Sequence, residues 1–484
     1  MTDLEQKISA AFAQATHLDS LDPDENFLNL GVSSLSVLEA LIMLSYDGIL
    51  LSTDMVIEAG TIRRLAQMCE ENAGNEGNTE ADAVYAMSPA MEQLYRRQVI
   101  NLKNDNDATR YDQIFVITLK DFTAAEVKNA ILEFARLHPS MYAGIKTIEG
   151  RPVLVKLHEL PDIPIKALDK KPSVYFLEKE ISTLDMENQC PFRIKLYYET
   201  SDEKTVYMLY QASHIVCDGY SVYMFCQTIF NILSGRPVHG ERKTIYDYLK
   251  TLEETPVEEN EKRYFDELLK YAAWELPVKY DDVKAYKCHS EYTFEAKKDA
   301  IDDCCRASGI SFSDLLIATI GEALCNEYNL DSVVGATINA GRYEPEDFNI
   351  WGCMYEHIPV VCKRAQDSAK TISIQIKKNS SMARHKKEAA IRDNYLFAFN
   401  DISLLNSVSE DDVEHYPLSR EMSPVNNREC DPPMYFSLDV TNDKKYRLSG
   451  GIDRGLMTRP EFKELIEKIS SLINAELETI RRDL

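Results

Sequence analysis

The sequence lacks the paired cysteines of common metal sites. It has 11 cysteines in 484 residues but no Cys-x-x-Cys pair, and the adjacent Cys304 and Cys305 do not have metal-site spacing. Scattered cysteines in a chain of this length do not form a disulfide framework. We therefore expect no metal site, and we expect most cysteines to be small buried hydrophobic residues kept reduced in the cytosol.

Long apolar runs and excess positive charge are also missing. The first residues, MTDLEQKISAAFAQ, have neither the basic nor the apolar region of a signal peptide. The best candidate for an apolar span, VLEALIMLSYDGILL, is interrupted by Glu39, Asp47 and Gly48. A net charge of −25 argues against nucleic-acid binding, because a phosphate backbone requires Lys and Arg. We expect a cytoplasmic protein without nucleic-acid or membrane partners.

The first 71 residues have the pattern of a small acidic helical bundle. LEQKISAAFAQA and TIRRLAQMCEE carry apolar residues at helical spacing, the second after the cap residue Thr61, and SSLSVLEALIMLSY begins with serines that favour a helix N-cap. Residues 1–71 contain 12 acidic and 3 basic residues. Residues 72–83, NAGNEGNTEADA, have no apolar period and predict a flexible linker.

From residue 84 onward, predicted strands alternate with predicted helices. The segments QIFVITLKD, FRIKLYYET and TVYMLYQASHIV predict strands, and SVYMFCQTIFNIL predicts a helix. A charged, strand-poor stretch around residue 255 leads into a second set that contains SVVGATINAG and HIPVVCK. This alternation indicates an α/β fold with two halves, residues 84–255 and 256–484.

The segment LNLGVSSLSVLEAL places Ser34 at the start of a predicted helix. A serine there is most often a helix cap, but Leu-Gly-x-x-Ser-Leu on an acidic bundle resembles the attachment site of acyl and peptidyl carrier proteins. The resemblance implies that Ser34 carries 4'-phosphopantetheine. The positive end of a helix dipole suits an incoming phosphodiester. The family usually has Asp or His just before this serine, whereas this chain has Ser33.

The segment QASHIVCDGYS contains the spacing HxxxDG, formed by His214, Asp218 and Gly219. The preceding VYMLYQA predicts a buried strand, and SVYMFCQTIFNIL after it predicts a helix. The motif therefore falls at a strand-to-helix junction, where side chains can face a cleft. A neutral imidazole there can accept a proton from an attacking amine or stabilise a developing tetrahedral intermediate.

This region resembles the HHxxxDG motif of nonribosomal peptide synthetase condensation domains, which have the chloramphenicol acetyltransferase fold. Further segments resemble this family in the right order: SPAMEQLY, LHPSMYAGI, CPFRIKL, IYDYL, SGISFSDLLIA, NAGRYEPEDFNIWGCMYEHIPV and DPPMYFSLDV. The resemblance implies two related α/β halves in a V shape. It also implies that His214 is the catalytic histidine, that Asp218 shapes the loop through an ion pair, and that Gly219 lets the backbone approach the substrate.

Several positions depart from the family pattern. Ser213 replaces the first histidine of the motif, and Tyr142 stands where an arginine usually partners the aspartate. Arg193 is then the candidate partner of Asp218. His357 occupies the place of a typical asparagine, and Phe265 replaces a usual tryptophan.

The resemblance implies an enzyme of natural product biosynthesis that transfers an acyl or peptidyl thioester to an amine or hydroxyl group, with its own carrier as donor. The implied partners are a phosphopantetheinyl transferase, a separate adenylation or loading enzyme and other carrier proteins. An epimerase is the first alternative, but Ile338 stands where epimerases carry a glutamate as the second acid/base group. The second alternative is a non-catalytic module that docks carriers.

Overall fold

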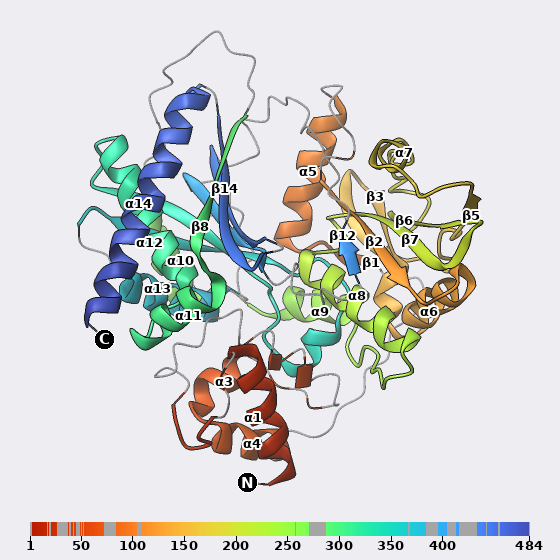
Figure 1. Cartoon of the computed structure of the whole chain (residues 1–484), viewed down its shortest axis with the longest axis horizontal. Coiled ribbons are helices and arrows are strands. Elements are labelled where there is room, and N and C mark those ends of the chain that lie inside the picture. The colour runs from red at the N-terminus through yellow and green to blue at the C-terminus, as the bar shows by residue number, and fades with distance from the viewer. Residues whose placement is uncertain are drawn as a thin grey trace.

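The chain folds into an N-terminal helical bundle and two α/β halves, each built on its own large β-sheet (Figure 1). The structure, a computed structural model, confirms the predicted order of a helical bundle before an α/β unit. It describes residues 2–483 except for 17, 19–20, 27–36, 38–39, 42, 45–48, 50, 52, 72–83, 104–108, 110, 257, 271–286, 366–367, 384–394, 404–412, 416–432, 442 and 454. The V-shaped arrangement of the halves stays a prediction, as do the domain boundaries.

Apolar helix faces form the core of the N-terminal bundle. Its helices with described bounds are α1 (Asp3–Thr16), α3 (Thr53–Ala59) and α4 (Ile62–Glu71). Phe12 and Leu65 are fully buried, and the helical residues Leu41 and Leu44 are nearly so. The helix α3 was not predicted from the sequence, whereas α1 and α4 were. Helices this short depend on shared burial, because isolated helices of this length are marginal in water.

Polar contacts fix the N-terminal end of α4. The Oγ1 atom of Thr61 accepts a hydrogen bond from the Arg64 N–H at 3.3 Å, so the predicted cap is confirmed. The guanidinium of Arg63 lies 2.6 Å from Asp24 and 3.2 Å from Glu5 of α1. Arg63 thus joins α4 both to α1 and to the loop that follows α1.

The first α/β half contains a five-stranded sheet in the order β12-β2-β7-β6-β5 and a three-stranded sheet in the order β1-β4-β3. The strands are β1 (Val84–Ala86), β2 (Asp112–Lys120), β3 (Ala143–Ile148), β4 (Arg151–Lys156), β5 (Ile165–Leu168), β6 (Phe192–Glu199), β7 (Asp202–Ser213) and β12 (Val413–His415). The helices are α5 (Pro89–Lys103), α6 (Ala124–Leu137), η1 (Pro139–Tyr142), α7 (Val174–Lys179), α8 (Gly219–Leu233) and α9 (Ile245–Glu254).

The second half contains a six-stranded sheet in the order β10-β9-β11-β13-β14-β8. Its strands are β8 (Lys287–Lys297), β9 (Ser332–Asn339), β10 (Glu356–Lys363), β11 (Phe397–Asp401), β13 (Met434–Val440) and β14 (Lys445–Asp453). Its helices are α10 (Glu259–Leu269), α11 (Lys298–Ala307), α12 (Phe312–Glu327), η2 (Pro345–Asn349), α13 (Ala369–Ala383) and α14 (Arg459–Asp483). Phe265 of α10 is buried against Val334 and Val361, so the residue that replaces a usual tryptophan belongs to the core.

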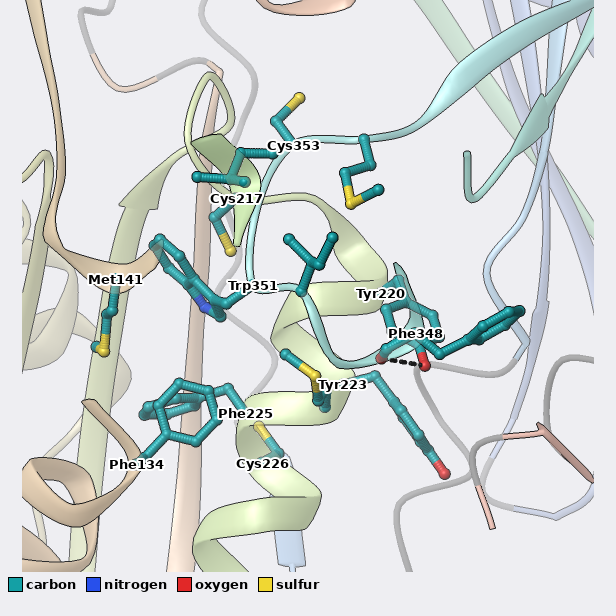
Figure 2. Close-up of a cluster of buried hydrophobic side chains, with 14 of the residues drawn as sticks. Phe134, Met141, Cys217, Tyr220, Tyr223, Phe225, Cys226, Phe348, Trp351 and Cys353 are labelled. Atoms are coloured by element: carbon teal, nitrogen blue, oxygen red, sulfur yellow. Dashed lines mark hydrogen bonds between the residues drawn. The ribbon is translucent and has the colours of Figure 1, made fainter. Parts of the chain in front are cut away.

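The second half enters the first at two places. The strand β12 pairs antiparallel with β2 of the first sheet. The segment 340–355, which connects β9 to β10, inserts apolar side chains into the core of the first half. Figure 2 shows Phe348 beside Tyr220 of α8 and Cys353 near Cys217 at the turn before α8, and Trp351 is fully buried. We call residues 340–355 the bridging segment.

Buried polar groups of the first half bind the backbone of the bridging segment. The carboxylate of Glu241 accepts hydrogen bonds from the N–H groups of Trp351 at 2.7 Å and Ser140 at 2.9 Å. The hydroxyl of Tyr220 donates to the Phe348 carbonyl at 3.0 Å (Figure 2). Unpaired backbone groups would be costly in a core, so these contacts fix the path of the segment.

Most of the cysteines are buried, as predicted. Ten cysteines lie in the described part of the chain; all are free thiols, and all except Cys69 are buried. Among the described residues, no group of three or more His, Cys, Asp or Glu side chains could hold a metal ion. No single described helix is long and apolar enough to cross a membrane, although α11 and α12, bent by 84°, meet that test as a pair.

Gly341 provides a stability prediction for the bridging segment. Its φ is +68°, and an added Cβ would lie 1.7 Å from the carbonyl oxygen of Met354. Gly150 has a φ of +79° with nothing within 4 Å of an added Cβ. Gly150→Ala should therefore lower the free energy of unfolding by about 1 kcal/mol, through the backbone conformation alone. Gly341→Ala should lower it several times more, because the backbone must also move away from the Met354 carbonyl. Urea unfolding curves measure both, and equal losses would contradict the role of the close approach.

Candidate functional site

The HxxxDG motif lies at the junction between β7 and α8, as the sequence predicted. Residues 206–213 of β7 are all buried, and the strand ends at Ser213. A turn at residues 214–216 follows, and α8 begins at Gly219 with Asp218 as its N-cap. The motif is thus held between the buried end of a strand and a largely buried helix.

His214 is held from both sides of the junction. Its backbone N–H donates to the Tyr111 carbonyl at 2.9 Å, and its ring lies against that of Tyr355, with 5.1 Å between centroids. The side-chain Nδ1 atom is buried and has no hydrogen-bond partner within the described parts of the chain. The residue as a whole keeps some exposed surface. Because Nδ1 itself is buried, the exposed surface of the residue lies on other atoms, and a substrate would meet His214 there.

The environment of His214 favours a neutral imidazole. Burial lowers the pKa of His214 below its ordinary value of 6.5, and the nearby charge of Arg97 on α5 lowers it further. The charge of Asp218 opposes this shift without reversing it. The ring is therefore neutral at pH 7 and can accept a proton.

Asp218 forms a buried ion pair with Arg342 of the bridging segment. The guanidinium donates to the two carboxylate oxygens at 2.9 and 3.2 Å. The carboxylate also accepts from the Met354 N–H at 2.9 Å and from the N–H and hydroxyl of Ser221, both at 2.8 Å. Burial alone would raise the pKa of Asp218, but Arg342 and these N–H groups outweigh it and lower the pKa below 3.8.

The predicted charge partner of Asp218 was wrong. Arg193 instead donates to the hydroxyl of Ser182 at 2.6 Å and to Gln211 at 3.4 Å. Arg342 supplies the charge from a segment more than 120 residues away in the sequence. Arg342 is the arginine of the NAGR stretch, which the sequence analysis noted. A sequence does not show, however, which arginine lies next to the aspartate in the folded chain. Tyr142 replaces the arginine that usually pairs with this aspartate, but Asp218 is still paired, because Arg342 takes that role.

The other motif residues have mainly structural contacts. The Oγ atom of Ser213 is buried and accepts from the Ile215 N–H at 3.3 Å, which stabilises the turn. Gly219 is the first residue of α8. The thiol of Cys217 lies 3.3 Å from the Tyr210 hydroxyl inside the core, and burial raises its pKa. Cys217 is thus a core residue and not an activated nucleophile.

The other departures from the family pattern lie close to the junction. Ile338 of β9 and His357 of β10 are cross-strand partners and are both half-buried. The ring of Tyr355 contacts the rings of both His214 and His357, with 5.1 and 5.4 Å between centroids. No glutamate stands at position 338 to act as a second base.

Ser34, the predicted attachment residue, lies outside the described residues. The described residues that follow it are helical, and Val37, Ala40, Leu41 and Leu44 are buried at helical spacing. This spacing places one apolar face of the helix in the bundle core. A serine three residues before Val37 falls at the predicted start of that helix, which suits an attachment site.

Two family models match this chain. The phosphopantetheine attachment site model matches residues 6–69, and the condensation domain model matches residues 84–390, more than half of the chain. The chain belongs to the condensation domain family. The bundle in front of the condensation domain is a carrier region, whose cofactor is 4'-phosphopantetheine. Membership of the condensation domain family supports acyl transfer as the general reaction class.

Relatives and solved structures agree with this membership. The chain is 22% identical over 377 residues to tyrocidine synthase 2 of Brevibacillus parabrevis, with 72% of this chain and 10% of that protein covered. It is 20% identical to surfactin synthase subunit 1 of Bacillus subtilis over 366 residues, with 72% and 10% covered. The chain therefore spans about a tenth of the length of these relatives.

Among solved structures, the epimerization domain of the third module of tyrocidine synthetase B matches with a TM-score of 0.62 at 15% identity, covering 84% of this chain and 99% of that one. A structure described as condensation domain-mediated chain release from the enacyloxin polyketide synthase matches with a TM-score of 0.62 at 14% identity, covering 76% and 78%. These likenesses establish the fold of the condensation domain.

The buried pair predicts a large stability difference between two arginines. Arg342→Met leaves the Asp218 charge buried without a counter-ion and should destabilise the protein by about 3–5 kcal/mol. Arg136→Met removes a similarly short pair, 2.6 Å from Glu133, whose two side chains are 67% and 39% exposed. That control should cost about 0–1 kcal/mol. Urea unfolding at neutral pH tests this, and similar losses in the two variants would refute the assignment.

Proposed function

We propose that this chain transfers an acyl or peptidyl group from a phosphopantetheine thioester to an amine or hydroxyl group. Ser34 is the attachment residue, and the carrier region is the donor. The observation that carries the proposal is the neutral imidazole of His214, a half-buried residue at the β7–α8 junction, beside the buried Asp218–Arg342 pair. In the reaction a C–N or C–O bond forms and the C–S bond breaks.

His214 is the proton acceptor in this proposal. Its neutral ring takes the proton of the nucleophile as the new bond forms, and this proton finally reaches the departing thiolate. No protein nucleophile is needed, because the acyl group arrives as an activated thioester. When bound to Ser34, the phosphopantetheine group supplies the flexible thiol that carries this thioester.

Asp218 and Gly219 act by positioning. The carboxylate of Asp218 is occupied by Arg342, Met354 and Ser221, so it is not available as a base. It holds the start of α8 and the bridging segment in one geometry. Gly219 adds no side chain at the first turn of α8, beside the approach to His214.

The chemistry defines the partners. A phosphopantetheinyl transferase must modify Ser34, and a separate adenylation or loading enzyme must supply the acyl group. Other carrier proteins are partners where the acyl group or the nucleophile arrives on them.

Epimerisation is the second candidate, because the fold also matches an epimerization domain over 84% of this chain. Ile338 argues against it, since it cannot act as the second acid/base group. Exchange of deuterium into the α-carbon of a carrier-bound aminoacyl group, without transfer, would favour this candidate. A non-catalytic docking module remains the third reading.

Modification of the carrier is tested by intact mass. Incubation with coenzyme A and a phosphopantetheinyl transferase should add one phosphopantetheine to the wild-type chain and none to Ser34→Ala. Ser36→Ala is the matched control, because Ser36 is a neighbouring serine outside the attachment motif, and it should be modified like wild type. Modification of Ser34→Ala would refute Ser34 as the attachment residue.

Transfer is tested with the acyl-loaded chain and an amine, followed by mass spectrometry of the product. His214→Ala should lower the rate by about 10²- to 10⁴-fold, the usual contribution of general acid–base catalysis. Carrier loading should be unchanged in this variant, because His214 does not belong to the carrier region. Product formation at the wild-type rate would favour the docking module instead.

The lowered pKa of His214 predicts the pH dependence of transfer. Since the neutral ring is the active form, kcat/KM should fall on the acid side with a midpoint below 6.5. Arg97→Met removes one contribution that lowers the pKa, so its midpoint should move up toward 6.5. A wild-type midpoint above 6.5, or a downward shift in the variant, would contradict the role of His214.

A further inference from the structure

The helix α13 presents an exposed basic face on the surface of the second half. Its residues Ala369–Ala383 contain three lysines and no acidic residue, in a chain whose net charge is −25. Lys370, Ile374 and Lys377 stand at helical spacing on one face of α13, and all three are exposed. Ile374 is 67% exposed, the highest exposed fraction among the large hydrophobic residues that the structure describes. We call these three residues the α13 face.

Side-chain hydrogen bonds attach α13 to β10. The amide of Gln375 donates to the Val361 carbonyl at 3.0 Å and accepts from the Val361 N–H at 3.1 Å. The amide of Asn379 donates to the Pro359 carbonyl at 2.6 Å. The helix therefore runs antiparallel to β10, and its C-terminal end points toward the start of this strand.

The start of β10 lies beside the candidate site. Tyr355, the residue just before the strand, contacts the His214 ring at 5.1 Å between centroids. Pro359 is four residues farther along, about 13 Å in an extended chain. A partner bound to α13 is thus anchored on the strand that begins beside His214.

The carrier region of the same chain is held at another place. The guanidinium of Arg306 on α11 donates to the carbonyl of Thr16, the last residue of α1, at 2.5 Å, and the Arg306 side chain is only 13% exposed. A cation is favoured at the C-terminal end of a helix, because the last carbonyls carry partial negative charge. Buried apolar residues of the bundle also belong to the same hydrophobic cluster as those of the first half. The bundle in this position leaves the α13 face exposed.

The carrier region has the charge that complements the α13 face. Residues 1–71 contain 12 acidic and 3 basic residues. Asp22, Glu25 and Glu58 of this region are exposed while Thr16 is bound to Arg306. Opposite charges across an interface steer association, and an apolar side chain among them adds burial that the charges do not provide. One helix face buries little area, so we expect weak and transient binding, which suits repeated delivery of acyl groups.

We propose that the α13 face binds the carrier region of a second copy of this chain, which delivers its acyl group to His214 of the first copy. This inference rests on the transfer function proposed above, in which the loaded carrier region is the donor. The lysines of the face pair with exposed carboxylates of the bundle, and Ile374 is covered between them. The second copy is the occupant, because the chain's own carrier region is held at Arg306, whereas that of another copy can bind without breaking this contact.

Binding is tested on unloaded full-length chains. Light and isotopically heavy chains are mixed in equal amounts, treated with a zero-length carboxyl-to-amine crosslinker, and digested for mass spectrometry. Crosslinks that join Lys370 or Lys377 to residues 1–71 should include mixed-isotope pairs, and they should decrease as salt is raised, because exposed charges are screened. If such crosslinks are absent, or join only peptides of matched isotope, the second copy is not the occupant.

Delivery is tested by dividing donor and catalyst between two full-length variants. His214→Ala, acyl-loaded on its carrier region, is the donor, and Ser34→Ala, which cannot be loaded, is the catalyst. The mixture should form product. Adding Ile374→Asp, or Lys370→Glu together with Lys377→Glu, to the catalyst should lower kcat/KM for the donor by about tenfold or more. The same changes in the donor should have no effect.

The helix α14 provides matched controls. Its residue Leu472 is 42% exposed, and Lys463 and Lys468 are exposed on the same helix. This helix packs on β8, at the opposite edge of the sheet from β10. Leu472→Asp, or Lys463→Glu together with Lys468→Glu, in the catalyst should leave transfer unchanged. A soluble acyl thioester of N-acetylcysteamine needs no docking, so every catalyst variant should use it at the same rate.

The outcomes separate this inference from the function beneath it. Failure of the wild-type chain to transfer from its own carrier and from the soluble thioester would sink the proposed function. An active wild type with no product from the mixture would overturn only delivery by a second copy. Equal losses in the α13 and α14 variants, or a loss that also appears with the soluble thioester, would overturn the α13 face as the docking site.

Discussion

The buried ion pair between Asp218 and Arg342 is the contact on which the candidate site depends. It joins the start of α8 in the first half to the bridging segment of the second half, where both side chains are almost completely removed from water. A single buried charge there would be costly, so each side chain needs the other. Because the carboxylate also binds the Met354 N–H, this pair fixes the distance from His214 to the residues that begin β10.

The bridging segment makes the two halves one structural unit at this point. Its apolar side chains fill the core of the first half, and Glu241 satisfies the backbone N–H of Trp351 in the interior. Close-packed protein interiors have low compressibility, so a displacement of one buried side chain is transmitted to its neighbours. The same segment delivers Tyr355 to the ring of His214, so packing far from the reacting atoms sets the surroundings of the imidazole.

The chemistry of His214 follows from burial more than from any single partner. The ring loses hydration, which disfavours its charged form, and Arg97 adds to this effect. Asp218 lies near enough to oppose the shift, but its charge is already shared with Arg342. The arrangement keeps the ring neutral at physiological pH, the state in which an imidazole can accept a proton from a nucleophile.

The sequence by itself determined the N-terminal helical bundle, the α/β class and the place of HxxxDG between a strand and a helix, because these depend on local periodicity and capping. It also contained the stretch with Arg342 but led to Arg193 as the partner of Asp218. Ion pairing between distant segments depends on how the halves pack, which no local pattern encodes. The tertiary structure alone decided that Arg342 folds back onto α8, and that the Tyr355 ring contacts the rings of His214 and His357.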